Sequence, residues 1–354
     1  MKKDLLLLAF CLLAISAIAQ PPAPDFNVTD SQGNLHRLYQ DYLDQGKTVV
    51  LEIFFTTCPP CNAIAPYVEP LYQEWGGGDG DVEFMAISTL SIDNSPQINA
   101  YKTMHGHTFP GVGTDGGSAA ARAPYTNGTY GTYLGTPTFV VIAPDRSVIY
   151  DPRGSGFTQT IHLIDEAIAA TGARKPFNLT GTVLDINNEP VSGVVIQMTD
   201  ADMTATTGAN GQYTLSGYMS PDSSYQLSLS KDGAYNNGVT NFDLIKIKKQ
   251  ILSLENLDSP EKRLAADANH SSSISTQDLI ALNKLILTID DTLPNQDSWI
   301  FIDADYEFAV PTAPYSEVYL TGEALPTFNV DRTNPLNIRA IKIGDVNGSA
   351  NPNE

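Results

Sequence analysis

The chain has 354 residues, of which 42% are hydrophobic and 17% charged, enough for two or three globular domains. With 40 acidic and 20 basic side chains its formal net charge is −20, which argues against nucleic acid and anionic membrane as partners and is compatible with cation binding. Cys11 lies in the N-terminal apolar run, and the two cysteines that remain exclude a four-cysteine zinc site and a framework of structural disulfides.

Residues 1–19 have the pattern of a secretory signal peptide. Two lysines precede an apolar run from Leu5 to Ile18, and Ala17-Ile18-Ala19 closes the segment. The run is too short for a membrane span, and its small residues predict cleavage after Ala19. We therefore expect an extracytoplasmic protein, periplasmic or secreted, that is not embedded in the membrane.

Residues 49–66 combine a strand, two cysteines and a helix. The run from Val49 to Phe55 is rich in β-branched and aromatic residues and predicts a buried strand, and a helix is expected from Asn62. Between them, Cys58 and Cys61 lie at a helix N-terminus, where the dipole and unpaired N–H groups stabilise a thiolate. Cys58 is the expected nucleophile in disulfide exchange, and Cys61 the thiol that resolves the mixed disulfide.

Strands and helices alternate around this stretch, which predicts an α/β domain over residues 20–175. The expected elements are a hairpin around residues 32–34 followed by a short helix, a strand at 82–88, a helix at 95–104, a hairpin of 136–142 with 147–150, and a closing helix at 161–170. We expect a kink or restart of the first helix at Pro66, and a lid or a loop from the insert 111–134. His105 and His107 are expected on a surface loop.

Four short motifs are shared with a known family. They are Pro24-Asp25-Phe26, Cys58-Pro59-Pro60-Cys61, Thr108-Phe109-Pro110 and Gly135-Thr136-Pro137-Thr138. On these motifs, residues 24–172 resemble a thioredoxin-fold domain of the TlpA-like, extracytoplasmic branch. The resemblance implies that Pro137 is cis, that it faces the cysteine pair, and that the backbone beside it pairs with the substrate chain.

The resemblance also gives a role to a carboxylate. Glu52 lies six residues before Cys58, where the family has a buried acid that moves a proton to and from the second cysteine, here Cys61. Inside an apolar strand this carboxyl should have a raised pKa. Thr57 stands where the family usually has tryptophan, so the rim of the partner groove is altered. The alternatives are a solvent-facing acid at Glu52, an ordinary loop proline at Pro137, and an inert clip formed by the two cysteines.

Residues 176–230 have short alternating runs separated by frequent turns, which predicts a small antiparallel β-sandwich. Such runs begin at Leu179, Val194 and Tyr225. The segment resembles carboxypeptidase-regulatory-like or Cna B-type domains, which act as stalks or binding modules. Nothing in it indicates catalysis.

Residues 231–290 contain a repeat with an offset of 35 residues. The ten residues from Asp243 match the ten from Asp278 at six positions, and each copy predicts an amphipathic helix preceded by a polar loop. The second loop, 267–278, has oxygen side chains at positions 1, 3, 5, 9 and 12, which is the spacing of a twelve-residue calcium loop. The first loop, 232–243, is poorer because Ala234 occupies position 3.

The paired loops and helices resemble a type I dockerin, in which each loop binds Ca²⁺ and the helices dock on a partner, here a cohesin-like or other protein. In the second loop the expected ligands are Asp267, Asn269, Ser271, Ser273 through its carbonyl, and Asp278. In the first loop they are Asp232, Asn236, Gly238 through its carbonyl, and Asp243. The alternative is a solvated polar turn before each helix, with Asp243 and Asp278 acting only near the helix N-termini.

Residues 291–354 form a β-rich C-terminal extension with β-like runs at 299–302 and 318–320. Its tail has Asp345 and Asn347 at calcium-ligand spacing. Our hypothesis is that this tail folds back and completes the first loop.

The sequence therefore predicts a multidomain protein: a thioredoxin fold, a small antiparallel β-sandwich, a dockerin-like duplication of calcium loops and helices, and the β-rich extension. We expect an exported thiol-disulfide oxidoreductase that acts on protein thiols and disulfides, with structural Ca²⁺ and no organic cofactor. The alternative is a secreted scaffold- or adhesion-associated protein. In it the repeat binds a partner, and the cysteine pair is a structural disulfide.

Overall fold

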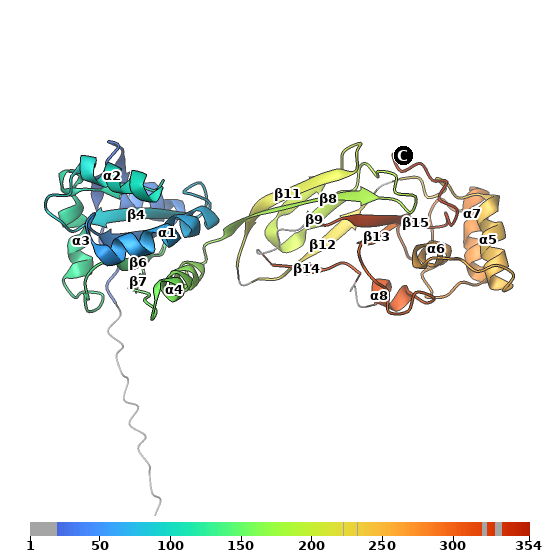
Figure 1. The fold of residues 1–354 in the computed structure, drawn as a ribbon. Coiled ribbons are helices and arrows are strands. Elements are labelled where there is room, and N and C mark those ends of the chain that lie inside the picture. The colour runs from blue at the N-terminus through green and yellow to red at the C-terminus, as the bar shows by residue number, and fades with distance from the viewer. Residues whose placement is uncertain (1–19, 222, 232, 321–323, 330–334) are drawn as a thin grey trace, which may run out of the picture. The chain divides into compact units, whose positions relative to one another are not determined.

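The computed structural model describes residues 20–221, 223–231, 233–320, 324–329 and 335–354. The expected signal peptide, 1–19, and Asp232, an expected calcium ligand, lie outside the described residues. The chain divides between Ala173 and Arg174 into two compact units (Figure 1). Across the described ranges, no helix has both the length and the apolar character that crossing a membrane requires.

A five-stranded sheet of order β5-β4-β3-β6-β7 forms the centre of the first unit. Its strands are β3 (Thr48–Phe54), β4 (Val82–Ser88), β5 (Gly111–Val112), β6 (Thr138–Ile142) and β7 (Val148–Tyr150). β3, β4 and β5 run parallel, whereas β6 pairs antiparallel with both β3 and β7. β3 and β4 are buried along their whole length, as expected for parallel strands covered on both faces.

Helices cover both faces of this sheet. α1 (Pro59–Glu74), α2 (Ser95–His105) and α4 (Phe157–Ala169) share one core with Val50 and Phe54 of β3. α3 (Ser118–Thr126) and the helical turns at 38–45 share the other core with Val49 and Leu51. Because side chains alternate along a strand, Glu52 lies on the face of β3 that α1 covers, the face that also holds both cysteines.

The predicted hairpin around residues 32–34 is formed by β1 (Asn27–Thr29) and β2 (Leu35–Arg37), and the other predicted strands and helices of this unit are present. Two expectations were wrong in whole or in part. α1 begins at Pro59 and continues through Pro66, so the helix does not restart there. The two prolines at its start, Pro59 and Pro60, are tolerated because the first turn has no intrahelical partner for their missing N–H groups. The insert 111–134 is not a lid or simple loop, because β5 pairs with β4 and α3 packs on the sheet through Ala121 and Tyr125.

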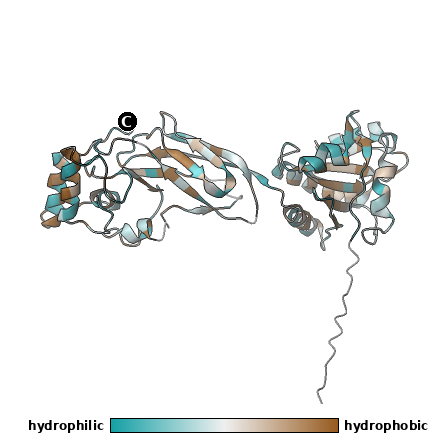
Figure 2. Cartoon of the chain, turned by 180° about the vertical axis from the view of Figure 1, so that it is seen from behind, coloured by the Kyte–Doolittle hydropathy of each residue, from teal (hydrophilic) through white to brown (hydrophobic). Residues whose placement is uncertain are grey.

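The second unit contains a sandwich of two four-stranded sheets that share one core. One has the order β11-β8-β15-β13, with β11 (Gln212–Met219), β8 (Lys175–Leu184), β15 (Ile338–Lys342) and β13 (Trp299–Asp303). The other has the order β10-β9-β12-β14, with β10 (Met203–Thr206), β9 (Val195–Met198), β12 (Tyr225–Ser230) and β14 (Thr327–Phe328). Figure 2 shows hydrophobic residues along the strands of both units.

The expected C-terminal extension is part of this sandwich. β15 pairs parallel with β8, and β14 pairs antiparallel with β12, so both sheets contain strands from after residue 290. β13 and β15 are covered on both faces: Phe301 and Ile338 face the sandwich core, while Ile302 and Ile341 face the helices. The paired strands are more than 100 residues apart, so no local pattern indicates that they pair. For this reason the sequence predicts the sandwich and the C-terminal extension as separate domains.

Four helices pack on the outer face of β13 and β15. They are α5 (Asn241–Ile251), α6 (Pro260–Ala266), α7 (Thr276–Ile286) and α8 (Tyr315–Tyr319). α5 and α7 are the two predicted helices of the repeat, and they lie against each other (Figure 1). The predicted β-like run at 318–320 is wrong, because α8 covers Tyr319 and packs through Tyr315 into this core.

Candidate functional site

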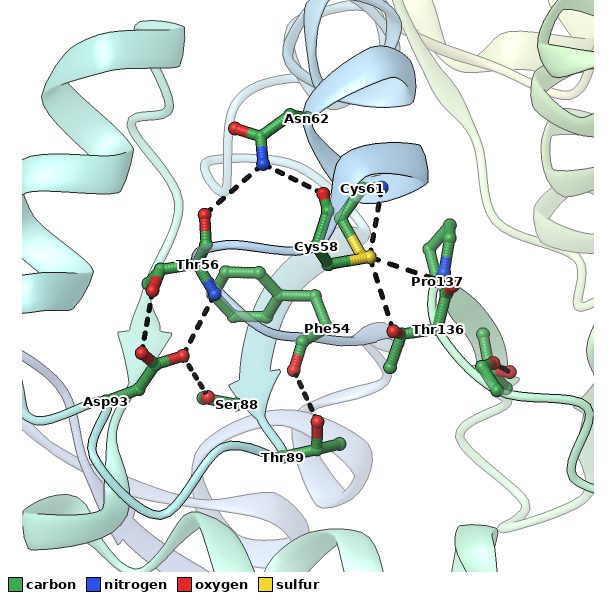
Figure 3. The surroundings of a disulfide bond; sticks show 12 residues. Phe54, Thr56, Cys58, Cys61, Asn62, Ser88, Thr89, Asp93, Thr136 and Pro137 are labelled. Carbon is green, nitrogen blue, oxygen red and sulfur yellow. Dashed lines mark hydrogen bonds between the residues drawn. A yellow bond between two sulfur atoms is a disulfide. The ribbon is translucent and has the colours of Figure 1, made fainter.

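Cys58 and Cys61 form a disulfide between the end of β3 and the first turn of α1 (Figure 3). Cys58 is the N-cap residue of α1, and its Sγ accepts a hydrogen bond from the Cys61 N–H at 3.2 Å. Pro59 and Pro60 fill the first helical positions and have no N–H. The Cys61 amide is therefore the first donor of the helix, and together with the dipole it would stabilise a Cys58 thiolate in the reduced protein.

The loop before β6 faces this disulfide. Its Thr136–Pro137 peptide bond is cis, as the resemblance implies. Cys58 Sγ lies 3.3 Å from Thr136 Oγ1 and 3.8 Å from the Thr136 carbonyl oxygen. Cys58 is 1% exposed and Cys61 is fully buried, although the neighbouring Pro59 is exposed. The disulfide is thus covered in this oxidised form, with Thr136 directly against the outer sulfur.

Glu52 is a buried carboxyl on the cysteine side of β3. It is 2% exposed, and neither of its carboxyl oxygens has a hydrogen-bond partner among the described residues. Burial without a partner raises the pKa of Glu52 to about 8. This is close to the pKa of an ordinary thiol, so the group is suited to exchange a proton with a cysteine.

Two side chains, one from the loop after β4 and one from α1 itself, hold the segment that leads to the disulfide. The buried carboxylate of Asp93 accepts hydrogen bonds from the Thr56 N–H at 2.9 Å, from Thr56 Oγ1 at 2.6 Å and from Ser88 Oγ at 2.6 Å. Asn62 Nδ2 donates to the carbonyls of Thr56 at 3.2 Å and Cys58 at 2.8 Å. The segment before Cys58 is therefore held from both sides (Figure 3).

The second predicted calcium loop brings its five expected ligands together. Asp267 accepts the N–H groups of Ser271 at 2.9 Å and Ser272 at 2.8 Å, and Asp278 accepts the N–H of Asn269 at 3.2 Å. Ser271 Oγ lies 3.2 Å from the carbonyl oxygen of Ser273. Asn269 Oδ1 is buried and has no partner in the described part of the chain. A buried, unpaired amide oxygen in a loop that also contains two buried carboxylates is compatible with a cation site.

The C-terminal tail repeats this pattern against the first loop. Asp345 accepts the N–H groups of Ser349 at 3.0 Å and Ala350 at 2.7 Å, four and five residues further on, as Asp267 does in the second loop. Asp243 accepts the N–H of Asn347 at 3.1 Å, and Ser349 Oγ donates to the Gly238 carbonyl at 3.0 Å. The tail therefore folds back on the first loop, as our hypothesis states.

One residue expected in the first loop does not take part in these contacts. Asn236 is exposed, whereas Ser349 Oγ donates to the Gly238 carbonyl, as Ser271 Oγ does to that of Ser273 in the second loop. The side-chain amide of Asn237 also binds the tail: its Nδ2 donates to the Asn351 carbonyl oxygen at 2.8 Å, and its Oδ1 accepts from the Asn351 N–H at 2.9 Å. Across the described residues, no group of three or more His, Cys, Asp or Glu side chains is placed to hold a metal, so amide, hydroxyl and carbonyl oxygens would have to contribute.

Comparison with known proteins places both units. The family model "Redoxin" matches residues 19–167, and the model "Carboxypeptidase regulatory-like domain" matches residues 178–254. The thiol-disulfide oxidoreductase ResA of Bacillus thuringiensis subsp. konkukian is 30% identical over 132 residues, which are 37% of this chain and 68% of the relative. The chain belongs to the redoxin family. Its redoxin domain is a thioredoxin-like domain of the thiol-disulfide oxidoreductase class.

Other relatives match a shorter part of the redoxin domain. ResA of Geobacillus thermodenitrificans is 38% identical over 93 residues, covering 25% of this chain and 47% of the relative, so the chain spans about half the length of this curated relative. The solved thioredoxin domain of a thiol-disulfide oxidoreductase from Bacteroides vulgatus has 17% sequence identity and a TM-score of 0.33, covering 42% of this chain and 96% of that one.

The redoxin domain contains the four catalytic residues expected from the sequence. Cys58, Cys61 and Pro137 adjoin one another, and Glu52 lies in the core behind them. Sequence reasoning missed Asp93, whose partner Thr56 lies 37 residues away, and the local contacts of Asn62 with the carbonyls of Thr56 and Cys58.

The prediction of a surface loop was wrong for His107, whereas His105 is partly exposed at the last residue of α2. His107 is buried and its Nε2 lies 3.1 Å from the Ala65 carbonyl oxygen, while His105 Nε2 lies 2.8 Å from Asn62 Oδ1. Tyr101 packs against both rings, and Phe109 packs against that of His107, which is the buried one. Such packing is not visible in the local sequence.

Proposed function

We propose that the protein is an exported thiol-disulfide oxidoreductase that acts on protein disulfides. The observation that carries the proposal is the Cys58–Cys61 disulfide at the N-terminus of α1, next to cis-Pro137 and in front of the unpaired carboxyl of Glu52. Export is supported by the signal-peptide pattern of residues 1–19.

In the proposed reaction the reduced protein attacks a client disulfide. The Cys58 sulfur bonds to one client sulfur, and the other client sulfur leaves as a thiolate that takes a proton from solvent. Glu52, as a carboxylate, then takes the proton of Cys61, whose sulfur attacks Cys58 and displaces the second client thiolate. Two electrons pass from the cysteine pair to the client, and the Cys58–Cys61 disulfide forms again.

Reduction of insulin by the purified protein, with dithiothreitol to regenerate the dithiol, tests this function. We expect the protein to accelerate the reduction of insulin over dithiothreitol alone. A rate equal to that of dithiothreitol alone would refute the proposal.

We propose further that the second unit binds two Ca²⁺ ions, one in each loop. Asp267, Asn269, Ser271, Asp278 and the Ser273 carbonyl would hold one ion. Asp345, Asn347, Ser349, Asp243 and the Gly238 carbonyl would hold the other, in a loop made of two segments that are about 100 residues apart in the chain. When bound, Ca²⁺ supplies a charge that offsets the two buried carboxylates in each loop.

Removal of the tail should therefore abolish one calcium site and spare the other. We expect a chain truncated after Ile343 to lose one of two binding events in a calorimetric Ca²⁺ titration. In a full-length Asp345→Asn variant, the affinity of that same site should fall about tenfold or more. Asp267→Asn is the matched control, because it should weaken the other site instead. An unchanged titration of Asp345→Asn would contradict the two-segment loop.

The dockerin resemblance is supported by exposed apolar side chains that recur on and just after α5 and α7. At the 35-residue offset Ile245 matches Ile280 within the helices, Leu252 matches Leu287 at their C-caps, and Leu254 matches Ile289 beyond them. We propose a folded protein of the cohesin type as the partner of this face. A purified cohesin domain should bind in Ca²⁺ and dissociate in EDTA; absence of binding in Ca²⁺ would contradict this partner.

A further inference from the structure

Arg153 connects the segment after β7 to the loop of the cis proline. Its Nη2 donates a hydrogen bond to the Pro137 carbonyl oxygen at 2.6 Å and lies 3.4 Å from Thr138 Oγ1. Asp151 accepts from Nε of the same guanidinium at 3.0 Å and from Nη2 at 3.1 Å. A planar guanidinium can serve a carboxylate and a carbonyl at the same time, which a lysine ammonium on its flexible stem does less well.

The Pro137 carbonyl lies beyond the ladder between β6 and β7. That ladder runs from Ile142 to Val140, and the Asp151 N–H then donates to the Phe139 carbonyl at 2.8 Å. On the other side of β6, pairing with β3 ends at Thr138. Within these described strands the Pro137 carbonyl therefore lies just past the last main-chain pairs of β6. Arg153 supplies the hydrogen-bond donor that a neighbouring strand would otherwise provide.

This hydrogen bond lies next to the reacting sulfur. Thr136, which precedes Pro137, contacts Cys58 Sγ through its hydroxyl and its carbonyl. A cavity of about 250 Å³ opens beside the same loop, lined among others by Pro60, Thr136, Pro137 and Arg153. The Arg153 side chain is 36% exposed and borders this cavity together with the loop that contacts Cys58.

We propose that Arg153 is a positioning residue for protein clients. By holding the Pro137 carbonyl it keeps the main chain at Thr136 aligned for pairing with an extended client segment beside Cys58. The inference rests on the proposed function and adds a distinction to it. A protein disulfide needs the aligned loop, whereas a small disulfide needs only access to the Cys58 sulfur.

The test compares Arg153→Met and Arg153→Lys with wild type on insulin and on oxidised glutathione, together with the reduction potential of the cysteine pair. We expect Arg153→Met to raise KM for insulin about fivefold to tenfold, and Arg153→Lys to restore part of the loss. The rate with oxidised glutathione should stay within about twofold of wild type, and the reduction potential should be unchanged. Neither quantity depends on the alignment of a protein client. Arg146→Met is the matched control: Arg146 also forms a partly exposed ion pair, with Asp44, but in the turn at the other end of β6.

Two results would overturn the inference. An insulin KM that is unchanged in Arg153→Met would show that the carbonyl contact is not needed for clients. Equal losses on insulin and glutathione, or a shifted potential, would show a general structural role. If wild type reduces neither substrate, the proposed function itself fails, and that outcome is distinct because it does not depend on any variant.

Discussion

Replacing Cys58 with serine should abolish the reduction of insulin, with a rate at least about 100-fold below that of wild type. A serine hydroxyl is hardly ionised near neutral pH, whereas a thiol at the N-terminus of α1 gains from the Cys61 amide at 3.2 Å and the helix dipole. Cys61→Ser should also stop turnover, but for a different reason. It keeps the nucleophile and loses the thiol that releases the client.

This difference supplies the control. Both variants lack the disulfide and therefore lose the same contribution of that bond to stability. They differ only in which of the two thiols is left to react. Cys61→Ser should accumulate a mixed disulfide with insulin, visible on a non-reducing gel, and Cys58→Ser should not. Equal insulin reduction by wild type and Cys58→Ser would refute Cys58 as the nucleophile.

Replacing Glu52 with glutamine should stabilise the oxidised protein at neutral and mildly alkaline pH. Burial raises the pKa of Glu52 from 4.5 in the unfolded chain to about 8 in the folded one. Between these values the folded state binds more protons than the unfolded state, so the free energy of unfolding decreases as pH rises. The loss at pH 7 is on the order of 3 kcal/mol, and a glutamine of the same shape does not suffer it.

Urea unfolding of wild type and Glu52→Gln at pH 4.5, 7 and 8.5 measures this effect. The two proteins should differ least at pH 4.5, and the advantage of the variant should grow up to about pH 8. The same substitution should slow the attack of Cys61 on the mixed disulfide and remove its increase with pH near 8. Glu83→Gln is the comparison: burial raises the pKa of Glu83 too, but hydrogen bonds from Tyr72 and from the Phe84 N–H, each at 3.0 Å, oppose that rise, so the gain of this variant with pH should be smaller. A constant difference between wild type and Glu52→Gln at all pH values would contradict the raised pKa.

The parts of the site that are fixed by residues close together in the chain could be predicted from the sequence. The strand before Cys58 is a continuous apolar run, and the cysteine pair follows it at the start of a helix, so the local pattern suffices. The position of Glu52 on the cysteine side of β3 follows from its alternation with Phe54. The tail with Asp345 could also be placed, because it repeats the spacing of the second calcium loop.

Contacts between distant segments could not be predicted. Asp93 binds Thr56 across 37 residues, and Arg153 binds Pro137 across 16. The residues around Asp93 and Arg153 in the sequence look like those around an ordinary charged surface residue, so neither contact could be foreseen. The place of β15 beside β8 was missed for the same reason, since parallel pairing joins Ile338 to Val183 without any turn between them. Burial of His107 depends on packing that forms only in the folded sheet.

The reduction potential of Cys58–Cys61 is the most direct test of whether this disulfide exchanges with clients or only stabilises the fold. Equilibration of the protein lacking residues 1–19 with mixtures of reduced and oxidised dithiothreitol would give the value. We expect a potential above about −300 mV, in the range of catalytic and exchangeable disulfides. A potential below about −300 mV would identify a structural disulfide and contradict the proposed enzymatic function.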